Sequence, residues 1–321
     1  MILLSPQSYK AIFIDSSSMK YLKSTAFTGK NLFVATVYVA VLLVWCKGCQ
    51  SSNKRVSPDT EPRKNKDLLI GNLGGIPNLG NTCYMNSVLQ IIAKLYPDIF
   101  RNQNSALARA GQVIVDKIRD DKDFVTREEA EAIYTALLNE ASGKFTRGSQ
   151  ESADECMDIL WQHCNLPLID QVINTPFITI ELQHPHDSNK ERKIQQLLDT
   201  YAGVANINAI DFINNVIPIK LSRVDLSSSG IGPIKINTVV KEALKLTMTP
   251  THTPWLTKDL NCQLMGLIVH TGSASGGHYF SYINLGGQWK LYNDDRVKVV
   301  TIGEVEQAAE QAYLYFYNYA S

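Results

Sequence analysis

The chain has 321 residues, of which 45% are hydrophobic and 19% are charged, so it holds enough apolar material for a large buried core. Its 31 basic and 31 acidic residues balance, and no basic stripe is visible, so the composition argues against a nucleic-acid partner. The six cysteines are too sparse for a disulfide-stapled scaffold, and the P-loop, G-x-G-x-x-G and H-E-x-x-H motifs are missing. We therefore expect a protein without a cofactor.

Residues 1–48 are predicted to be an N-terminal export signal or membrane anchor. The run Leu32–Trp45 is apolar and uncharged, but it is shorter than the roughly 20 residues that a spanning helix needs. Cys49 and the Gln-Ser-Ser after it resemble the lipidated cysteine of a bacterial lipoprotein, so a lipid anchor, a short single-pass anchor and a cleaved signal stay open. Each would export the protein or associate it with a membrane. A bacterial-type signal would suggest action inside a eukaryotic host cell.

Residues 49–67 are polar, mixed in charge and contain two prolines, so we expect a flexible linker. Cys46 and Cys49 form a C-x-x-C pair, but no second pair follows, so a four-ligand zinc site is not expected. The folded domain is predicted to span residues 68–321.

Helices dominate the first part of this domain. Asn81 and Thr82 are typical helix-capping residues, and they precede apolar residues with the one-face spacing of a buried helix that starts near Tyr84. Cys83 therefore lies at a helix N-terminus, where unpaired N–H groups and the helix dipole favour a thiolate. Further helices are predicted over 105–120, 126–140 and 152–164.

Short strands dominate the second part. They are predicted over 177–184, 216–224, 233–238, 262–270, 278–285, 288–293, 297–302 and 312–319, with one charged helix over 190–202. Helices first and antiparallel strands after them indicate an α+β fold, in which a helical half faces an antiparallel β-sheet half. An active-site cleft would lie between two such halves.

A cysteine nucleophile needs a base, and six histidines compete for this role. Five of them are expected away from a catalytic site. His184, His186 and His252 are expected in solvent, His163 on a helix without a partner, and His270 in the core or at its rim. His278 differs because it follows the glycine-containing loop 271–277 and opens a strand.

The strand that begins at His278 also predicts a partner for it. The Gly-Gly pair at 286–287 is typical of a two-residue hairpin, which sets the register of the strands on either side. In that register Asn293 is the diagonal, same-face neighbour of His278, whereas Asp294 points to the other face. Asn293 could then hold one imidazole nitrogen while the other nitrogen faces a thiol.

Two segments together resemble the cysteine and histidine boxes of the ubiquitin-specific protease family of deubiquitinases. They are GIPNLGNTCYMNSVLQ, residues 75–90, and GGHYFSYINLGGQWKLYNDDRV, residues 276–297. QESADECMDIL, residues 150–160, is similar to the family's middle box, and the resemblance extends over about 68–319 in the family's order. It implies a papain-like cysteine peptidase fold and, as partners, ubiquitin or ubiquitinated proteins.

Carried over residue by residue, the resemblance implies that Cys83 is the nucleophile, His278 the general base and Asn293 the residue that orients the imidazole. Asn78 would donate its amide to the oxyanion of the tetrahedral intermediate. From the residues alone, Asn78 would be interpreted as a turn residue. Asp294 would support these catalytic residues. The residues expected to contact the substrate are Gln150, Glu151, Ser152, Gly277 and Tyr279.

The chain departs from the family pattern at several positions. Ser152 stands where the family usually has an acidic residue, and Cys156 where it usually has phenylalanine. Asn293 replaces an aspartate, but it still fixes the tautomer, and the family uses both residues. Residues 182–217 contain none of the paired C-x-x-C motifs of the family's zinc-bearing fingers, so we expect short fingers without a metal.

The predicted function is that of a thiol isopeptidase acting at the C-terminus of ubiquitin. The alternatives are a protease for another ubiquitin-like modifier, a catalytically silent module that binds ubiquitin, and a transferase with the same Cys-His-Asn chemistry. The catalytic boxes do not encode the choice between modifiers. The complete set of catalytic residue types argues against a silent module.

Overall fold

The computed structural model describes residues 73–101, 103–168, 175–182, 186–200, 213–225, 232–252 and 256–319. These residues belong to one compact unit of the chain, Asn65–Ser321. The predicted signal or anchor, residues 1–48, and the predicted linker, residues 49–67, lie outside the described residues. Within the described ranges, no helix is both long enough and apolar enough to cross a membrane.

Four helices lie in the described residues of the first half of this unit. They are α2 (Cys83–Leu95), α3 (Ala106–Ile118), α4 (Arg127–Glu140) and α5 (Ala153–His163). Thr126 caps α4 and forms a capping box with Glu129, and the side chain of Ser105 accepts a hydrogen bond from the amide of Ala108 at the start of α3. The helices predicted for this half are therefore confirmed.

Helix α2 carries Cys83 at its first position, and nearly all of its residues are buried. It packs against the sheet, where Gly266 lets the backbone come close, because a Cβ there would lie 2.9 Å from the Cδ1 atom of Ile91. Burial of one large aliphatic side chain stabilises a fold by about 1.5–3 kcal/mol. The core therefore holds α2, and with it Cys83, in a fixed place against the sheet.

The second half is an eight-stranded sheet with the order β1–β3–β12–β8–β9–β10–β11 and with β7 paired to β8. The strands are β1 (Ile178–Glu181), β3 (Val216–Ser222), β7 (Lys245–Met248), β8 (Leu260–Ser273), β9 (Gly276–Leu285), β10 (Gln288–Asn293), β11 (Arg296–Val299) and β12 (Ala312–Tyr319). Among the described strands of this sheet, only β1 and β3 run parallel, so the expectation of a purely antiparallel half is wrong at one edge. The long connection between these two strands permits the crossover that a parallel pair requires.

Smaller elements complete the unit. They are the pairs β2 (Glu191–Lys193) with β6 (Val239–Lys241) and β4 (Val224–Asp225) with β5 (Ile234–Lys235), the helices α6 (Ile194–Asp199) and α7 (Ile302–Ala309), and a short 3-10 turn (Ile213–Asn215). The predicted helix 190–202 thus begins as a strand. The predicted strand 297–302 ends at Val299, because Thr301 and Glu304 form a capping box that starts α7.

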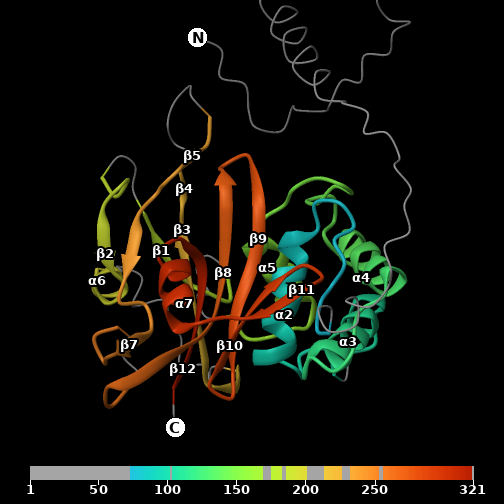
Figure 1. Ribbon diagram of the computed structural model, residues 1–321, viewed down its shortest axis with the longest axis horizontal. Coiled ribbons are helices and arrows are strands. Elements are labelled where there is room, and N and C mark those ends of the chain that lie inside the picture. Colours follow the sequence, from blue (N-terminus) through green and yellow to red (C-terminus); the bar gives the residue numbers. More distant parts are fainter. Residues whose placement is uncertain are drawn as a thin grey trace, which may run out of the picture. The chain divides into compact units, whose positions relative to one another are not determined.

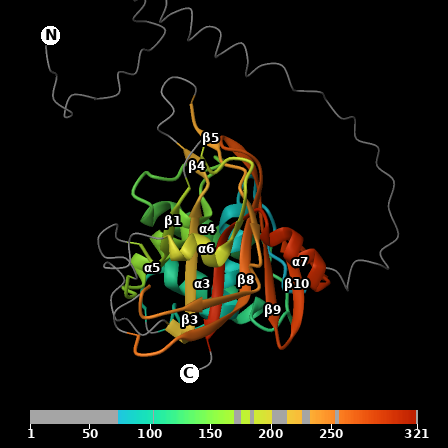
Figure 2. The same cartoon turned by 90° about the vertical axis from the view of Figure 1, so that its left-hand side faces the viewer.

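The sheet separates two hydrophobic cores. In β12, Leu314 and Phe316 point into the core shared with α2 to α5, whereas Tyr315 and Tyr317 point into the core shared with α6 and α7. Figure 1 shows α2 to α5 grouped beside β8 to β10, and Figure 2 shows the unit from the side that carries α6. An α+β fold with helical and sheet halves is therefore confirmed.

Candidate active site

Cys83 follows a loop, residues 76–82, that the side chain of Asn78 organises from within. The Oδ1 atom of Asn78 accepts a hydrogen bond from the amide of Thr82 at 3.3 Å. Thr82 occupies the cap position of α2, but its hydroxyl accepts the amide of Leu79 at 3.0 Å and not an amide of the helix. Because Thr82 does not cap the helix, the first-turn amides of α2 are left for the thiol or for a bound substrate.

The surroundings of Cys83 favour the protonated thiol over the thiolate. The residue is 4% exposed, and burial raises the pKa of the thiol above its usual value. Hydrogen bonding from the backbone at Tyr279 opposes this rise in pKa, and the negative charge of Asp294 adds to it. The first-turn amides of Cys83 and Tyr84 do lower the pKa of the thiol, as expected for a helix N-terminus, but burial outweighs them. A base has to take the proton.

His278 lies near the start of β9, and its Nε2 atom is 2.7 Å from Oδ1 of Asn293. In the hairpin of β9 and β10, Gln288 pairs with Leu285, which is the register that the Gly-Gly pair at 286–287 predicts. Asn293 accepts through its carbonyl, so Nε2 of His278 carries a proton and Nδ1 keeps a lone pair. The predicted pairing of His278 with Asn293 is confirmed as geometry.

The prediction that Asp294 points away from His278 is wrong. Asp294 has a φ of +54° and lies in the two-residue turn that joins Asn293 to its partner Arg296. This left-handed conformation ends the in-and-out alternation of the strand. As a result, Oδ2 of Asp294 lies 4.0 Å from Nε2 of His278 and accepts a hydrogen bond from Nδ2 of Asn78 at 2.9 Å. A carboxylate therefore stands beside the uncharged Asn293.

A hydrogen bond from Asn86 connects this carboxylate to helix α2, which carries Cys83. It lies on α2 one turn after Cys83, is 2% exposed, and donates from Nδ2 to Oδ1 of Asp294 at 2.8 Å. Longer contacts from the same nitrogen reach the carbonyls of Ile76 and Pro77, at 3.3 and 3.4 Å. Asn86 is not among the residues predicted for the site, although a polar side chain within an apolar helix is a signal that could have identified it.

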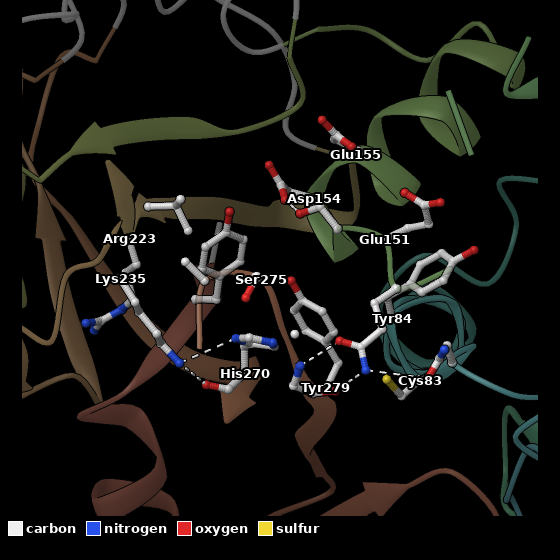
Figure 3. Close-up of a pocket in the computed structure, with 18 of the residues that line it drawn as sticks. Cys83, Tyr84, Glu151, Asp154, Glu155, Arg223, Lys235, His270, Ser275 and Tyr279 are labelled. Carbon is white, nitrogen blue, oxygen red and sulfur yellow. Dashed lines mark hydrogen bonds between the residues drawn. The ribbon is translucent and has the colours of Figure 1, made fainter. Parts of the chain in front are cut away.

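A cavity of about 420 Å³ opens beside Cys83. The residues predicted to contact substrate all line it, together with the nucleophile: Cys83, Gln150, Glu151, Ser152, Gly277 and Tyr279. Figure 3 shows Cys83 at one end of this cavity and Lys235 at the other, with the Tyr279 and His270 rings between them. The structure thus brings together residues from the cysteine box, the middle box and the histidine box.

The serine at position 152 is accompanied by a carboxylate two residues later. Ser152 precedes α5, and its hydroxyl hydrogen-bonds the carboxylate of Asp154, which also forms an ion pair with Lys220 of β3. Asp154 is 3% exposed, and Lys220 balances its charge inside the protein. Removal of Lys220 would therefore leave a buried charge unpaired. Glu155 is the exposed carboxylate on this side of the cavity.

His270 is a poor candidate for the base. Burial and the positive charge of Lys235 lower the pKa of His270 to about 4, so its ring is too weak a base to hold the proton of a thiol near pH 7. The Nζ atom of Lys235 donates to the backbone carbonyl of His270 at 2.8 Å, and the His270 ring packs against Tyr279 with centroids 4.4 Å apart. His270 therefore lies in the cavity wall.

The remaining cysteines of the described ranges are structural. Cys156, Cys164 and Cys262 are buried and free, and Cys156 fills a core position at which the family usually has phenylalanine. Within the same ranges, no cluster of three or more His, Cys, Asp or Glu side chains is arranged to hold a metal ion.

Comparisons with known proteins show the family to which the chain belongs. Residues 74–317 match the protein family described as ubiquitin carboxyl-terminal hydrolase. The chain belongs to this family. The match includes the loop before Cys83, the middle box and the histidine strand, and it ends within β12.

Curated relatives come from two yeasts. The probable ubiquitin carboxyl-terminal hydrolase 16 of Schizosaccharomyces pombe is 24% identical over 78% of this chain and 68% of its own length. Ubiquitin carboxyl-terminal hydrolase 15 of the same organism is 22% identical over 72% of this chain but 25% of its own length. Ubiquitin carboxyl-terminal hydrolase 8 of Saccharomyces cerevisiae is 40% identical over 61 residues, 19% of this chain and 12% of its own length. The chain thus spans a quarter or less of the last two relatives.

Solved structures of the SAGA DUB module, which contains Ubp8, share the fold. The module bound to ubiquitin aldehyde aligns with a TM-score of 0.56 and 17% identity, over 79% of this chain and 72% of that one. A Ubp8 variant bound to monoubiquitin aligns with a TM-score of 0.57 and 17% identity, over 89% of this chain and 75% of that one. This likeness confirms the papain-like α+β fold predicted from the sequence.

Proposed function

We propose that the protein is a cysteine-type deubiquitinase that hydrolyses the peptide or isopeptide bond at the C-terminus of ubiquitin. The observation that carries this proposal is the hydrogen-bonded pair of His278 and Asn293, which lies beside Asp294, a carboxylate whose charge acts on the Cys83 thiol. Family membership and the names of the relatives point to ubiquitin as the substrate.

In the first step, Nδ1 of His278 takes the proton of the Cys83 thiol, and the sulfur attacks the carbonyl carbon of the scissile bond. A C–S bond forms, and the carbonyl electron pair moves onto the oxygen. Asn293 holds the resulting imidazolium through the proton on Nε2, and the carboxylate of Asp294 faces it at 4.0 Å. Asp294 thus supplies the negative charge that Asn293 lacks.

The oxyanion would be stabilised by Asn78. One N–H of its amide is held by Asp294, which leaves the second N–H for the developing charge. A preorganised donor of this kind contributes about 3–4 kcal/mol to transition-state stabilisation in other hydrolases. Asp294 and Asn86 together would hold this donor in place before substrate arrives.

Collapse of the tetrahedral intermediate breaks the C–N bond, and the His278 imidazolium gives its proton to the leaving amine. Cys83 is then joined to ubiquitin as a thioester. His278 next takes a proton from water, whose oxygen attacks the thioester carbonyl, and the C–S bond breaks. The products are the free C-terminal carboxyl group of ubiquitin and the Cys83 thiol.

The C-terminal tail of ubiquitin would occupy the cavity beside Cys83. Glu151, Ser152, Gly277 and Tyr279 line this space and would contact the tail, with Gln150 beside them. Glu155 adds an exposed negative charge, which suits a tail that carries basic side chains.

A protease for another ubiquitin-like modifier is the second candidate, and one observation favours it. Ser152 lacks the acidic group usual in the family, and the nearby carboxylate of Asp154 is already paired with Lys220. The test compares kcat/KM for C-terminal amides of ubiquitin and of related modifiers. Ubiquitin should be the preferred substrate by at least about 10-fold, a difference of about 1.4 kcal/mol. Turnover of another modifier alone would contradict the assignment to ubiquitin, and no turnover of any would support a silent module.

We also propose that the segment before the catalytic unit associates the protein with a membrane. The support is the apolar run Leu32–Trp45 in the sequence, together with Cys49 as a lipidation position. The full-length chain should appear in the membrane fraction, and a chain that starts at Leu68 should not. Full-length protein recovered unprocessed in the soluble fraction would contradict the proposal.

A further inference from the structure

The start of strand β9, which carries His278, is supported by a neighbouring strand on one side. Strand β8 pairs with β9 as far as Ser273 opposite Gly276. The pairing with β10 on the other side ends at Tyr292 opposite Ser281. Among the strands that the structure describes, none pairs with this second edge of β9 at His278.

Two glycines precede His278 and give this strand end conformational freedom. Gly277 has to be a glycine, because a Cβ there would lie 2.0 Å from the carbonyl oxygen of Thr271 and 2.5 Å from Nε2 of His270. The backbone therefore passes tightly against β8 at this point. Its other edge still needs hydrogen bonds to hold the strand in place.

The side chain of Gln150 provides those hydrogen bonds. Its Oε1 atom accepts the amide of Gly277 at 2.6 Å, and its Nε2 atom donates to the carbonyl of the same residue at 3.0 Å. One side-chain amide thus makes both of the bonds that a residue in an adjacent antiparallel strand would make. The Nε2 atom also reaches Oδ1 of Asn81 at 3.4 Å, and Asn81 donates to the carbonyl of Gly148 at 2.7 Å.

We propose that Gln150 is a positioning residue that stands in for a missing strand and holds the start of β9 so that His278 faces Cys83. Its hydrogen bonds join Asn81, two residues before the nucleophile, to Gly277, one residue before the base. The inference rests on the proposed function in that it takes Cys83 and His278 to react together. It assigns Gln150 a role that does not depend on contact with the substrate.

The expected effect is moderate because these hydrogen bonds are exposed to solvent. The hydrophobic cores do not include Gln150, so its replacement should leave the domain folded. Loss of the paired bond to Gly277 should lower the fraction of Cys83 that is present as a thiolate near neutral pH by about 10-fold.

The test compares three variants of the full chain. Gln150→Met keeps the length of the side chain and removes both polar atoms. Gln150→Glu keeps an acceptor for the amide of Gly277 and should recover part of the loss. Gln162→Met, at an exposed position of α5, is the matched control. The readout is the alkylation rate of Cys83 by iodoacetamide between about pH 5 and pH 9, measured on the Cys83 peptide by mass spectrometry without ubiquitin.

The proposal predicts that Gln150→Met slows alkylation of Cys83 near neutral pH by about 10-fold and lowers kcat on a ubiquitin amide to a similar extent. The alkylation rate of Gln162→Met should equal that of the wild type. Wild-type alkylation in Gln150→Met, with only KM raised, would overturn the proposal and make Gln150 a substrate contact. A wild-type protein that does not cleave ubiquitin, but whose alkylation still depends on Gln150, would contradict the proposed function and support the positioning role.

Discussion

Replacement of Asp294 tests how the site stabilises charge. Asp294→Asn keeps the size of the side chain and removes its charge. In the wild type, Nδ2 of Asn78 and Nδ2 of Asn86 donate to separate carboxylate oxygens of Asp294, at 2.9 and 2.8 Å. In the variant, a single amide oxygen would have to accept from both donors. Both changes should lower kcat, because the imidazolium loses a nearby negative charge and the oxyanion donor loses its anchor.

The geometry sets the size of the effect. Two unit charges 4.0 Å apart, the distance from Oδ2 of Asp294 to Nε2 of His278, interact by about 4 kcal/mol at an effective dielectric constant near 20. The Asp294 side chain is 13% exposed, and the variant retains a dipole, so we expect about 1.5–3 kcal/mol to be lost. This corresponds to a decrease of about 10–100-fold in kcat/KM. The charge of Asp294 raises the pKa of Cys83, so its removal does not itself hinder thiolate formation.

The assay measures kcat and KM on one ubiquitin C-terminal amide for the wild type, Asp294→Asn and Asp295→Asn. Asp295 lies in the same turn but is exposed, so its replacement removes an equal charge without touching the Asp294 contacts. We expect Asp295→Asn to behave like the wild type. An Asp294→Asn protein with normal kcat would refute the role given to this carboxylate.

Three further predictions follow from the same geometry. Asn293→Ala should lower kcat by about 10–100-fold, because the imidazole loses its acceptor, and Asn293→Asp should keep most activity; a silent Asn293→Ala would contradict the pairing with His278. His278→Ala should abolish turnover of a ubiquitin amide, while His270→Ala should retain most of it because a pKa near 4 makes His270 too weak a base for the thiol proton; the reverse order of damage would mean that the base has been assigned wrongly. Activity measured after dialysis against a strong chelator should be unchanged, and loss that is restored by zinc would contradict a metal-free mechanism.

Local signals in the sequence predicted the elements that carry the site. The capping box of Thr126 and Glu129 marks the start of α4, because both groups act within one turn of the chain. The Gly-Gly pair at 286–287 fixes the hairpin register, which places Asn293 beside His278. Signals of this kind depend on residues close in sequence, so they can be interpreted without the fold.

Two local signals did not determine the outcome, because tertiary packing intervened. The alternation of a strand predicts the direction of Asp294 only as far as the strand continues, and here a left-handed turn residue ends it. The helix dipole favours a thiolate at Cys83, but burial of the thiol outweighs it. The turn conformation and the depth of burial both come from tertiary packing.

Contacts of histidines with residues distant in sequence could not be predicted from local patterns either. His252 is expected in solvent, yet it is 4% exposed and its Nε2 atom lies 2.9 Å from Asp199. His163 is expected without a partner, yet its ring lies between the Ser105 hydroxyl at 2.5 Å and the Glu140 carboxylate at 3.3 Å. Neither contact leaves a short-range pattern, because each joins residues brought together by the packing of separate elements.

The measurement that tests the central claim most directly is covalent capture of the nucleophile. The full chain is treated with ubiquitin that carries a thiol-reactive group at its C-terminus, and the adduct is mapped by mass spectrometry. We predict one adduct per chain, located at Cys83, and none in Cys83→Ala, which should still bind ubiquitin measurably. No adduct with the wild type, or an adduct at another cysteine, would contradict the account.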